Sequence, residues 1–108
     1  MNSAAALEAV ERILNRGGEP DAVLRAVLEA LRARGVSYAA IRFGRGDLAS
    51  GEAADAVEAP IVFEGAEVGT LTLSTRDGAF IARVATLISS YVRSASVAAQ
   101  SAEHFQRS

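Results

Sequence analysis

The segment from Ala79 to Gln106 most constrains the fold, because it reads as one unbroken helix with a regular apolar stripe. The stripe residues alternate at spacings of three and four, which is the heptad pattern of helices that pack lengthwise on other helices. At 1.5 Å per residue this helix would be roughly 40 Å long, whereas a strand of about seven residues spans only roughly 23 Å. We therefore expect residues 94–106 to extend past any sheet that this chain can form. The stripe comprises Ile81, Val84, Ile88, Tyr91, Ala95, Ala98, Ala102 and Phe105.

An apolar stripe that extends past its own sheet needs another surface to bury it. The matching surface is the apolar face of a first helix, predicted over Ser3 to Asn15. We expect a symmetric homodimer in which the terminal helices of two chains form a four-helix bundle. The alternatives are a tail that folds onto its own first helix in a monomer, or one that frays. The expected interface comprises Leu7, Val10, Leu14, Val84, Ile88, Tyr91, Ala95, Ala98, Ala102 and Phe105.

Between the terminal helices the pattern predicts one more helix and then strands. A glycine pair ends the first helix, and a second helix opens at Pro20 and closes at Gly35. The stretch from Val36 to Phe43 is rich in β-branched and aromatic residues and predicts a strand. A weaker strand, LASGE, follows from Leu48.

The stretch from Pro60 to Ser74, PIVFEGAEVGTLTLS, predicts a β-hairpin. Its strand residues alternate at the period of a half-buried strand on both sides of a turn, EGAE, from Glu64 to Glu67. The seven residues before Pro60, AADAVEA, show no firm period. After the hairpin, Thr75 or Asp77 is the expected N-cap of the last helix.

Composition indicates a single domain, residues 1–108, with one core. Half of the residues are hydrophobic and 22% are charged. The net charge of -2 is too small to attract nucleic acid or an anionic membrane over the whole surface. The chain has no cysteine, so it offers no disulfide and no thiolate metal site. Because we find neither a secretion signal nor an apolar run of about twenty residues, we expect a cytoplasmic protein.

The order helix, helix, strand, short strand, hairpin, long helix resembles the GAF domain, a sensor module of the PAS-like group. The resemblance is sharpest in APIVFEGAEVGTLTLS and FIARVATLISSYVRSA, which look like the late strand pair and last helix of that family. LRAVLEALRARGVSYAAIRF looks like its second helix and first strand. The resemblance implies an α+β fold, with the N-terminal helices and the long C-terminal helix on one face of an antiparallel sheet and a small-molecule pocket on the other. It also implies dimers that relay signals to output domains.

The chain departs from the GAF pattern in ways that bear on function. Only AADAVEA separates the weak strand from Pro60, where ligand-binding members insert helices and loops that close the pocket. We therefore expect most of the lid to be missing. We also expect no attached output domain, so a signal would have to pass to a separate protein. The cysteines that chromophore-binding and methionine-sulfoxide-reducing members use are absent.

No set of residues in the sequence suits catalysis or metal binding. The chain has one histidine, His104, and the neighbouring Glu103 would point elsewhere on a helix. In the last helix no histidine lies near enough in the pattern to activate Ser89, Ser90, Ser94 or Ser96. Glu64 and Glu67 flank a turn, where carboxylates are usually solvated. We therefore expect no enzymatic activity, no cofactor and no metal.

Strand alternation predicts a small polar patch on the sheet face away from the terminal helices. Tyr38 and Arg42 share one side of the first strand, and Thr70 and Thr72 lie opposite the core side of the hairpin. If these strands are neighbours, as they are in GAF domains, the four side chains cluster around one cation. Such a patch could hold a small anionic or aromatic molecule. The alternative is an exposed surface with ordinary polar side chains.

These patterns together predict a non-catalytic GAF-like regulatory or interaction module that homodimerises through its N- and C-terminal helices and acts on a separate signalling protein. One alternative is a sensor that binds a small ligand on the open sheet face. Another is a dimeric scaffold of the roadblock type. That family has a helix between its early and late strands, where this chain has only the short AADAVEA.

Overall fold

The structure, a computed structural model, describes residues 3–43, 46–51 and 56–107, with residues 46 and 98–107 described by their backbone alone. It confirms the predicted α+β class, because helices flank a single run of strands. Predicted and observed helix bounds differ by only one or two residues. The elements are α1 (Ser3–Arg16), α2 (Pro20–Ala33), β1 (Tyr38–Phe43), β2 (Gly46–Gly51), β3 (Val57–Phe63), β4 (Ala66–Leu73) and α3 (Gly78–Arg107).

The strands form one antiparallel sheet in the order β2-β1-β4-β3. β1 and β4 are therefore the inner strands, and β2 and β3 are the edges. Ala40 of β1 lies opposite Thr72 of β4, and Arg42 lies opposite Thr70. The first strand is thus a direct neighbour of the second hairpin strand, which is the condition that the predicted polar patch requires.

β3 and β4 form the predicted hairpin, with a shorter turn than the sequence indicated. Phe63 lies opposite Ala66, so the turn consists of Glu64 and Gly65 alone. Both residues have a positive φ, 52° and 82°, as in the type I′ turn that two-residue hairpins favour. Ala66 and Glu67 consequently belong to the strand and not to the turn.

The edge strand β3 begins at Val57, three residues before the expected start at Pro60. Most of its residues are exposed, because an edge strand meets the rest of the molecule on one side only. Val57 and Ala59 do alternate with Glu58, but neither of them is buried. So short and weakly apolar a pattern explains why the sequence before Pro60 did not identify the strand. Proline is tolerated within it because an edge strand leaves one row of backbone groups unpaired.

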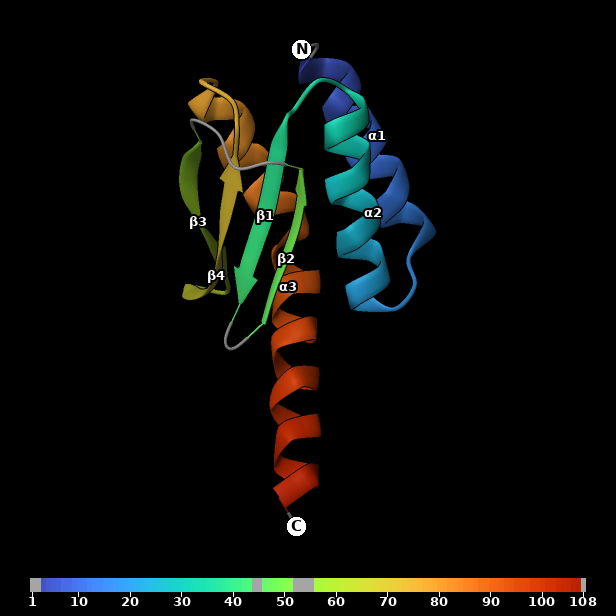
Figure 1. Cartoon of the computed structure of the whole chain (residues 1–108), viewed down its shortest axis with the longest axis vertical. Coiled ribbons are helices and arrows are strands. Elements are labelled where there is room, and N and C mark those ends of the chain that lie inside the picture. The colour runs from blue at the N-terminus through green and yellow to red at the C-terminus, as the bar shows by residue number, and fades with distance from the viewer. Residues whose placement is uncertain (1–2, 44–45, 52–55, 108) are drawn as a thin grey trace.

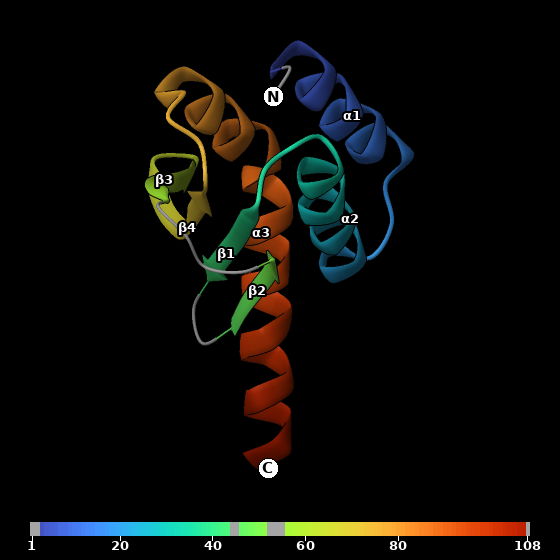
Figure 2. The ribbon, with the colours of Figure 1, turned by 45° about the horizontal axis from the view of Figure 1, so that its top comes forward.

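All the helices lie on the same side of the sheet, in two layers (Figures 1 and 2). α2 packs against β1 and β2, and α3 packs against β3, β4 and β1. α1 packs on α2 and α3 and forms an outer layer. The helices are therefore on one side as expected, but α1 covers the other helices instead of the sheet. No described helix covers the opposite face of the sheet (Figure 1).

The core lies between the sheet and the layer formed by α2 and α3. The inward side chains of the strands alternate as predicted, with Ala39, Ile41 and Phe43 of β1 and Leu71 and Leu73 of β4 all buried. The helices contribute mostly branched aliphatic residues. Among these are Val10, Val23, Leu24, Val27, Leu28, Leu31, Ile81, Val84, Ile88 and Val92.

Most of the predicted dimer interface lies inside or against this core. The buried members are Val10, Val84, Ile88 and Ala95, and the partly buried members that pack on the core are Leu7, Leu14 and Tyr91. One chain therefore accounts for the apolar character of these residues without a second copy. The side chains of the remaining members, Ala98, Ala102 and Phe105, lie outside the described residues.

α3 is capped at its start by Asp77, one of the two expected N-caps. Asp77 Oδ1 accepts a hydrogen bond from the backbone N–H of Phe80 at 3.0 Å. Its Oδ2 accepts one from the Ser3 hydroxyl at 3.2 Å, which ties the start of α1 to the start of α3. At the other end, α3 continues past the ends of the strands (Figure 1).

Candidate functional site on the open sheet face

The four residues of the predicted polar patch share the uncovered face of the sheet. Tyr38 and Arg42 of β1 alternate with buried residues that point to the core. Thr70 and Thr72 of β4 lie opposite Arg42 and Ala40 in the β1 to β4 register. The structure therefore brings these side chains onto one surface, as strand alternation predicted.

A shallow hollow of about 170 Å³ lies in the middle of this surface. Ala40 and Ala49 are paired across β1 and β2, and their small side chains leave the space open. Thr70 is not among the lining residues, so the predicted patch and the hollow only partly coincide. The lining residues are Tyr38, Ala40, Ile41, Arg42, Asp47, Ala49, Glu58 and Thr72.

Two charged residues of this hollow, Asp47 and Glu58, were not predicted from the sequence. Asp47 lies opposite Arg42 across β1 and β2, and Glu58 lies opposite Thr72 across β3 and β4. Both come from the edge strands, which have weak or absent apolar periods. The alternation of β2 from Leu48 could have identified Asp47, but neither pairing follows without the strand register.

The two carboxylates change the kind of ligand that the hollow could accept. Among the described lining residues Arg42 is the only cation and Asp47 and Glu58 are anions, so their formal charges sum to −1. The side chains of Arg42, Asp47 and Glu58 form no hydrogen bond or ion pair with any described residue, so all three are free to meet a ligand. A purely anionic molecule, as the sequence suggested, would face two like charges. A small molecule with both an ammonium and a carboxylate group fits the lining better.

The size of the hollow limits its ligand further. Drug-sized ligands occupy pockets of roughly 300–1,000 Å³. At about 30 Å³ for each water molecule, the present hollow holds about five or six waters. The open face can therefore enclose only a molecule of a few heavy atoms.

The described residues provide no cluster of metal-ligating side chains. No group of three or more histidine, cysteine, aspartate or glutamate side chains among them is close enough to hold a metal ion. The hydroxyl of Ser89 donates a hydrogen bond to the Thr86 carbonyl oxygen at 2.9 Å, which is a local contact within α3. The side chain of His104 lies outside the described residues.

Comparison with known proteins adds no assignment, because no protein family, curated protein or solved structure matches the chain. The GAF resemblance thus stays a prediction from the residues that suggested it. In the described part of the chain, no helix is both long and apolar enough to cross a lipid bilayer.

Proposed function

We propose that this chain is a non-catalytic, GAF-like regulatory or interaction module that self-associates through its terminal helices. The observation that carries the proposal is the length of α3. Its 30 residues correspond to about 45 Å of helix, whereas the eight residues of β4 correspond to about 27 Å. The long axis of the molecule, 47 Å, matches the helix and exceeds the sheet. The last turns of α3 therefore have no sheet to pack on.

The final turns of α3 need a partner on physical grounds. A helical segment of about ten residues is marginal in water without tertiary packing. Its sequence continues the heptad spacing of the buried half through Ala98, Ala102 and Phe105, and the alanines would let a second helix approach closely. Val97, at the start of this segment, is 45% exposed. A second copy of the same segment would bury both stripes.

The fold of the single chain narrows the proposed interface. A four-helix bundle that used the apolar face of α1 would have to uncover Val10, which the chain already buries. We therefore propose that the contact begins near Val97 and runs along residues 98–105 of two chains. In this arrangement α1 keeps its place on α2 and α3.

Several features support the GAF resemblance. β1 lies beside β4, the helices lie on one side of the sheet, and the described part of the opposite face is open. Only residues 52–56 separate β2 from β3. That length does not suit the intervening helix of the roadblock family, so it favours the GAF-like alternative.

The test is the solution mass by light scattering over a dilution series. We expect the full chain to be a dimer and a version truncated after Val97 to be a monomer. The cut is made there because Ala95 is buried and belongs to the core. A full chain that is monomeric throughout the series would refute the proposal.

A matched pair of variants separates the stripe from the rest of the tail. A98E with A102E introduces two carboxylates on the stripe, and S96E with Q100E introduces the same charge on the opposite side of the helix. We expect the first pair to dissociate the dimer and the second to leave it intact. Equal behaviour of both pairs would mean that the stripe is not the contact.

A second candidate function is sensing of a small ligand, favoured by the hollow beside Tyr38, Arg42 and Thr72. Glycine, alanine and serine are suitable probes because each has both charges and few heavy atoms. Binding should shift the amide resonances of Ala40 and Ala49. The variant A40L should abolish these shifts by filling the hollow, whereas V62L, outside the lining, should not. The sensor alternative fails if none of the probes shifts these resonances.

A further inference from the structure

The two edges of the sheet differ in the backbone groups that they leave unpaired. Ser74 donates its N–H to the Tyr38 carbonyl oxygen at 3.0 Å, so the backbone groups of Tyr38 face β4. Because these groups alternate along a strand, Ala39 and Ile41 face β2. They pair with Ser50 and Leu48 in the register of β1 and β2. The N–H and C=O groups of Asp47 and Ala49 and the N–H of Gly51 therefore point outward, and none of them bonds to a described residue.

The opposite edge is blocked by proline. By the same alternation, Leu71 and Leu73 of β4 face β3 and pair with Ala59 and Val57. The outward row of β3 therefore includes Pro60, which has no N–H to donate. Proline on an edge strand prevents another strand from pairing there. The described residues of β2 carry no proline, so β2 is the edge that remains able to accept a strand.

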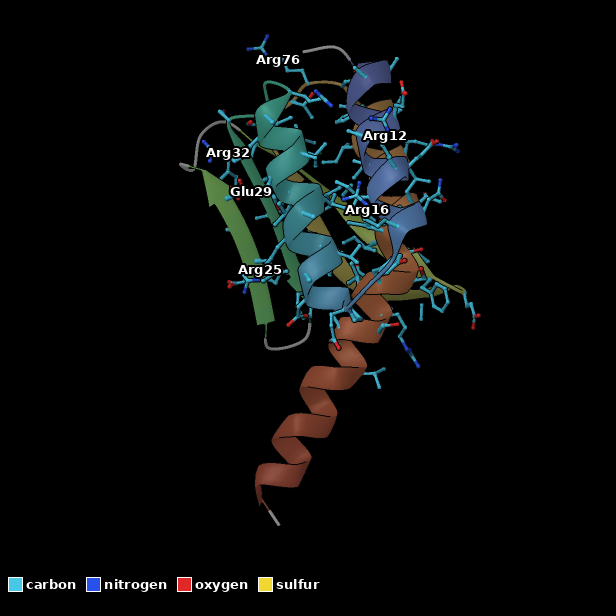
Figure 3. All side chains as sticks on the ribbon, turned by 90° about the vertical axis from the view of Figure 1, so that its right-hand side faces the viewer. Arg12, Arg16, Arg25, Glu29, Arg32 and Arg76 are labelled. Carbon is cyan, nitrogen blue, oxygen red and sulfur yellow. The ribbon has the colours of Figure 1, made fainter. Side chains whose placement is uncertain are left out.

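A groove runs along the β2 edge beside α2. It has a volume of about 220 Å³, with Leu28 and Leu48 forming its apolar floor. α2 stands beside β2 in Figure 1, on the side where a fifth strand would lie. Figure 3 faces this edge, and there Arg25, Glu29 and Arg32 lie along the side of α2 next to β2. A strand paired with β2 would therefore have one face against α2.

The side of α2 next to β2 carries Arg25, Glu29 and Arg32 (Figure 3), a net charge of +1 that favours an acidic occupant. Glu29 Oε1 accepts a hydrogen bond from the Ser50 hydroxyl at 2.9 Å, and its negative charge remains between the two arginines. Arg32 makes one long contact from Nη1 to the same hydroxyl oxygen, at 3.4 Å. The Arg25 side chain forms no hydrogen bond or ion pair with a described residue. The two arginines lie about 10 Å apart along the helix by their seven-residue separation. Their flexible side chains can reach carboxylates on one face of an extended chain, where like-facing positions are about 7 or 13 Å apart.

We propose that the β2 edge and the adjacent side of α2 form a docking site for an extended acidic segment of a partner protein, which joins the sheet as a fifth strand. Backbone bonds to Asp47, Ala49 and Gly51 would supply the pairing, and acidic side chains facing Arg25 and Arg32 would supply the selectivity. A second copy is a poorer occupant, because pairing two β2 edges would bring the arginines of both α2 helices together. The site is separate from the tail of α3, so it does not depend on the proposed dimer.

The probe is a pair of capped peptides of about seven residues, a usual strand length. One has threonine and valine on one face and two glutamates on the other, and its control has lysines in place of the glutamates. We expect the glutamate peptide to bind at least about fivefold more tightly by fluorescence anisotropy. We also expect it to protect the amides of Asp47, Ala49 and Gly51 from hydrogen exchange. Equal binding of the two peptides, no binding of either, or protection of other amides alone would overturn the proposal.

Two sets of variants test the edge and the charges separately. A49P removes an outward N–H, as Pro60 does in β3, and should weaken binding at least about tenfold, whereas A49V keeps the N–H and should bind the peptide. R25E with R32E changes only exposed side chains and should reverse the preference, so that the lysine peptide binds better. Unchanged binding by A49P, or an unchanged preference in the reversed variant, would refute the site. If A49P lowers the mass of the free protein, the edge is an interface between copies and the proposal fails.

Discussion

The two halves of α3 have the same apolar spacing but different surroundings. From Ile81 to Ala95 the stripe is covered by the sheet, by α1 and by α2, and Ile88 is fully buried. From Val97 onward the helix has left the sheet (Figure 1), and Val97 itself is 45% exposed. A heptad spacing therefore identifies an apolar face, but it does not reveal whether the same chain or another chain covers that face.

The largest effect should come from the covered half. I88A removes a fully buried side chain and should lower the free energy of unfolding by about 2–5 kcal/mol. V97A, at an exposed position beside the stripe in the part of α3 past the sheet, should change it by less than about 0.5 kcal/mol. Urea denaturation of both variants measures the difference. Similar losses of unfolding free energy in I88A and V97A would show that the two halves of α3 are buried to the same extent.

The start of the covered half depends on its cap. D77A removes the acceptor of the Phe80 N–H and of the Ser3 hydroxyl, and it should cost about 1 kcal/mol. D77N keeps a side-chain oxygen for the cap and should cost much less. Urea midpoints of the two variants decide the matter, and an equally large loss with asparagine would show that the cap bond is not the cause.

A side-chain hydrogen bond joins the middle of α3 to α1. The hydroxyl of Tyr91 donates to the Leu14 carbonyl oxygen at 3.1 Å, near the end of α1. Y91F should lower the free energy of unfolding by about 0.5–1.5 kcal/mol and should speed amide exchange in α1. S89A is the control, because that hydroxyl bonds only within α3. If α1 exchanges at the same rate in Y91F, the bond does not hold the helix.

The smallest change in intrinsic stability should come from the tail. Truncation after Val97 removes no residue of the described core, so the monomer should lose less than about 0.5 kcal/mol. The full chain should differ from the truncated one in its thermal unfolding midpoint. This midpoint should rise with protein concentration, because a dimer is stabilised by mass action. Thermal unfolding at several concentrations measures this. A concentration-independent midpoint for the full chain would argue against self-association.

Sequence periodicity located most elements of the fold but not their full extent. Helices, the first strand and the hairpin were predictable because each has a clear apolar period or a glycine or proline boundary. The start of β3 at Val57 was not predictable, since most side chains of this edge strand are exposed. The predicted turn, Glu64 to Glu67, was two residues too long. A turn of Glu64 and Gly65 alone requires a positive φ at Glu64, which the sequence does not indicate for a glutamate. For the candidate site, alternation assigned Tyr38, Arg42, Thr70 and Thr72 to one face, but Asp47 and Glu58 required the register.

The sequence by itself determined which face of each helix and inner strand is apolar, because those periods follow from local backbone geometry. It also determined that α3 is longer than any strand of the chain. Only the tertiary structure decided that α1 covers α2 and α3, that two carboxylates flank Arg42, and that β2 is the edge free of proline. These features depend on strand order and on contacts between distant residues, which no local period records.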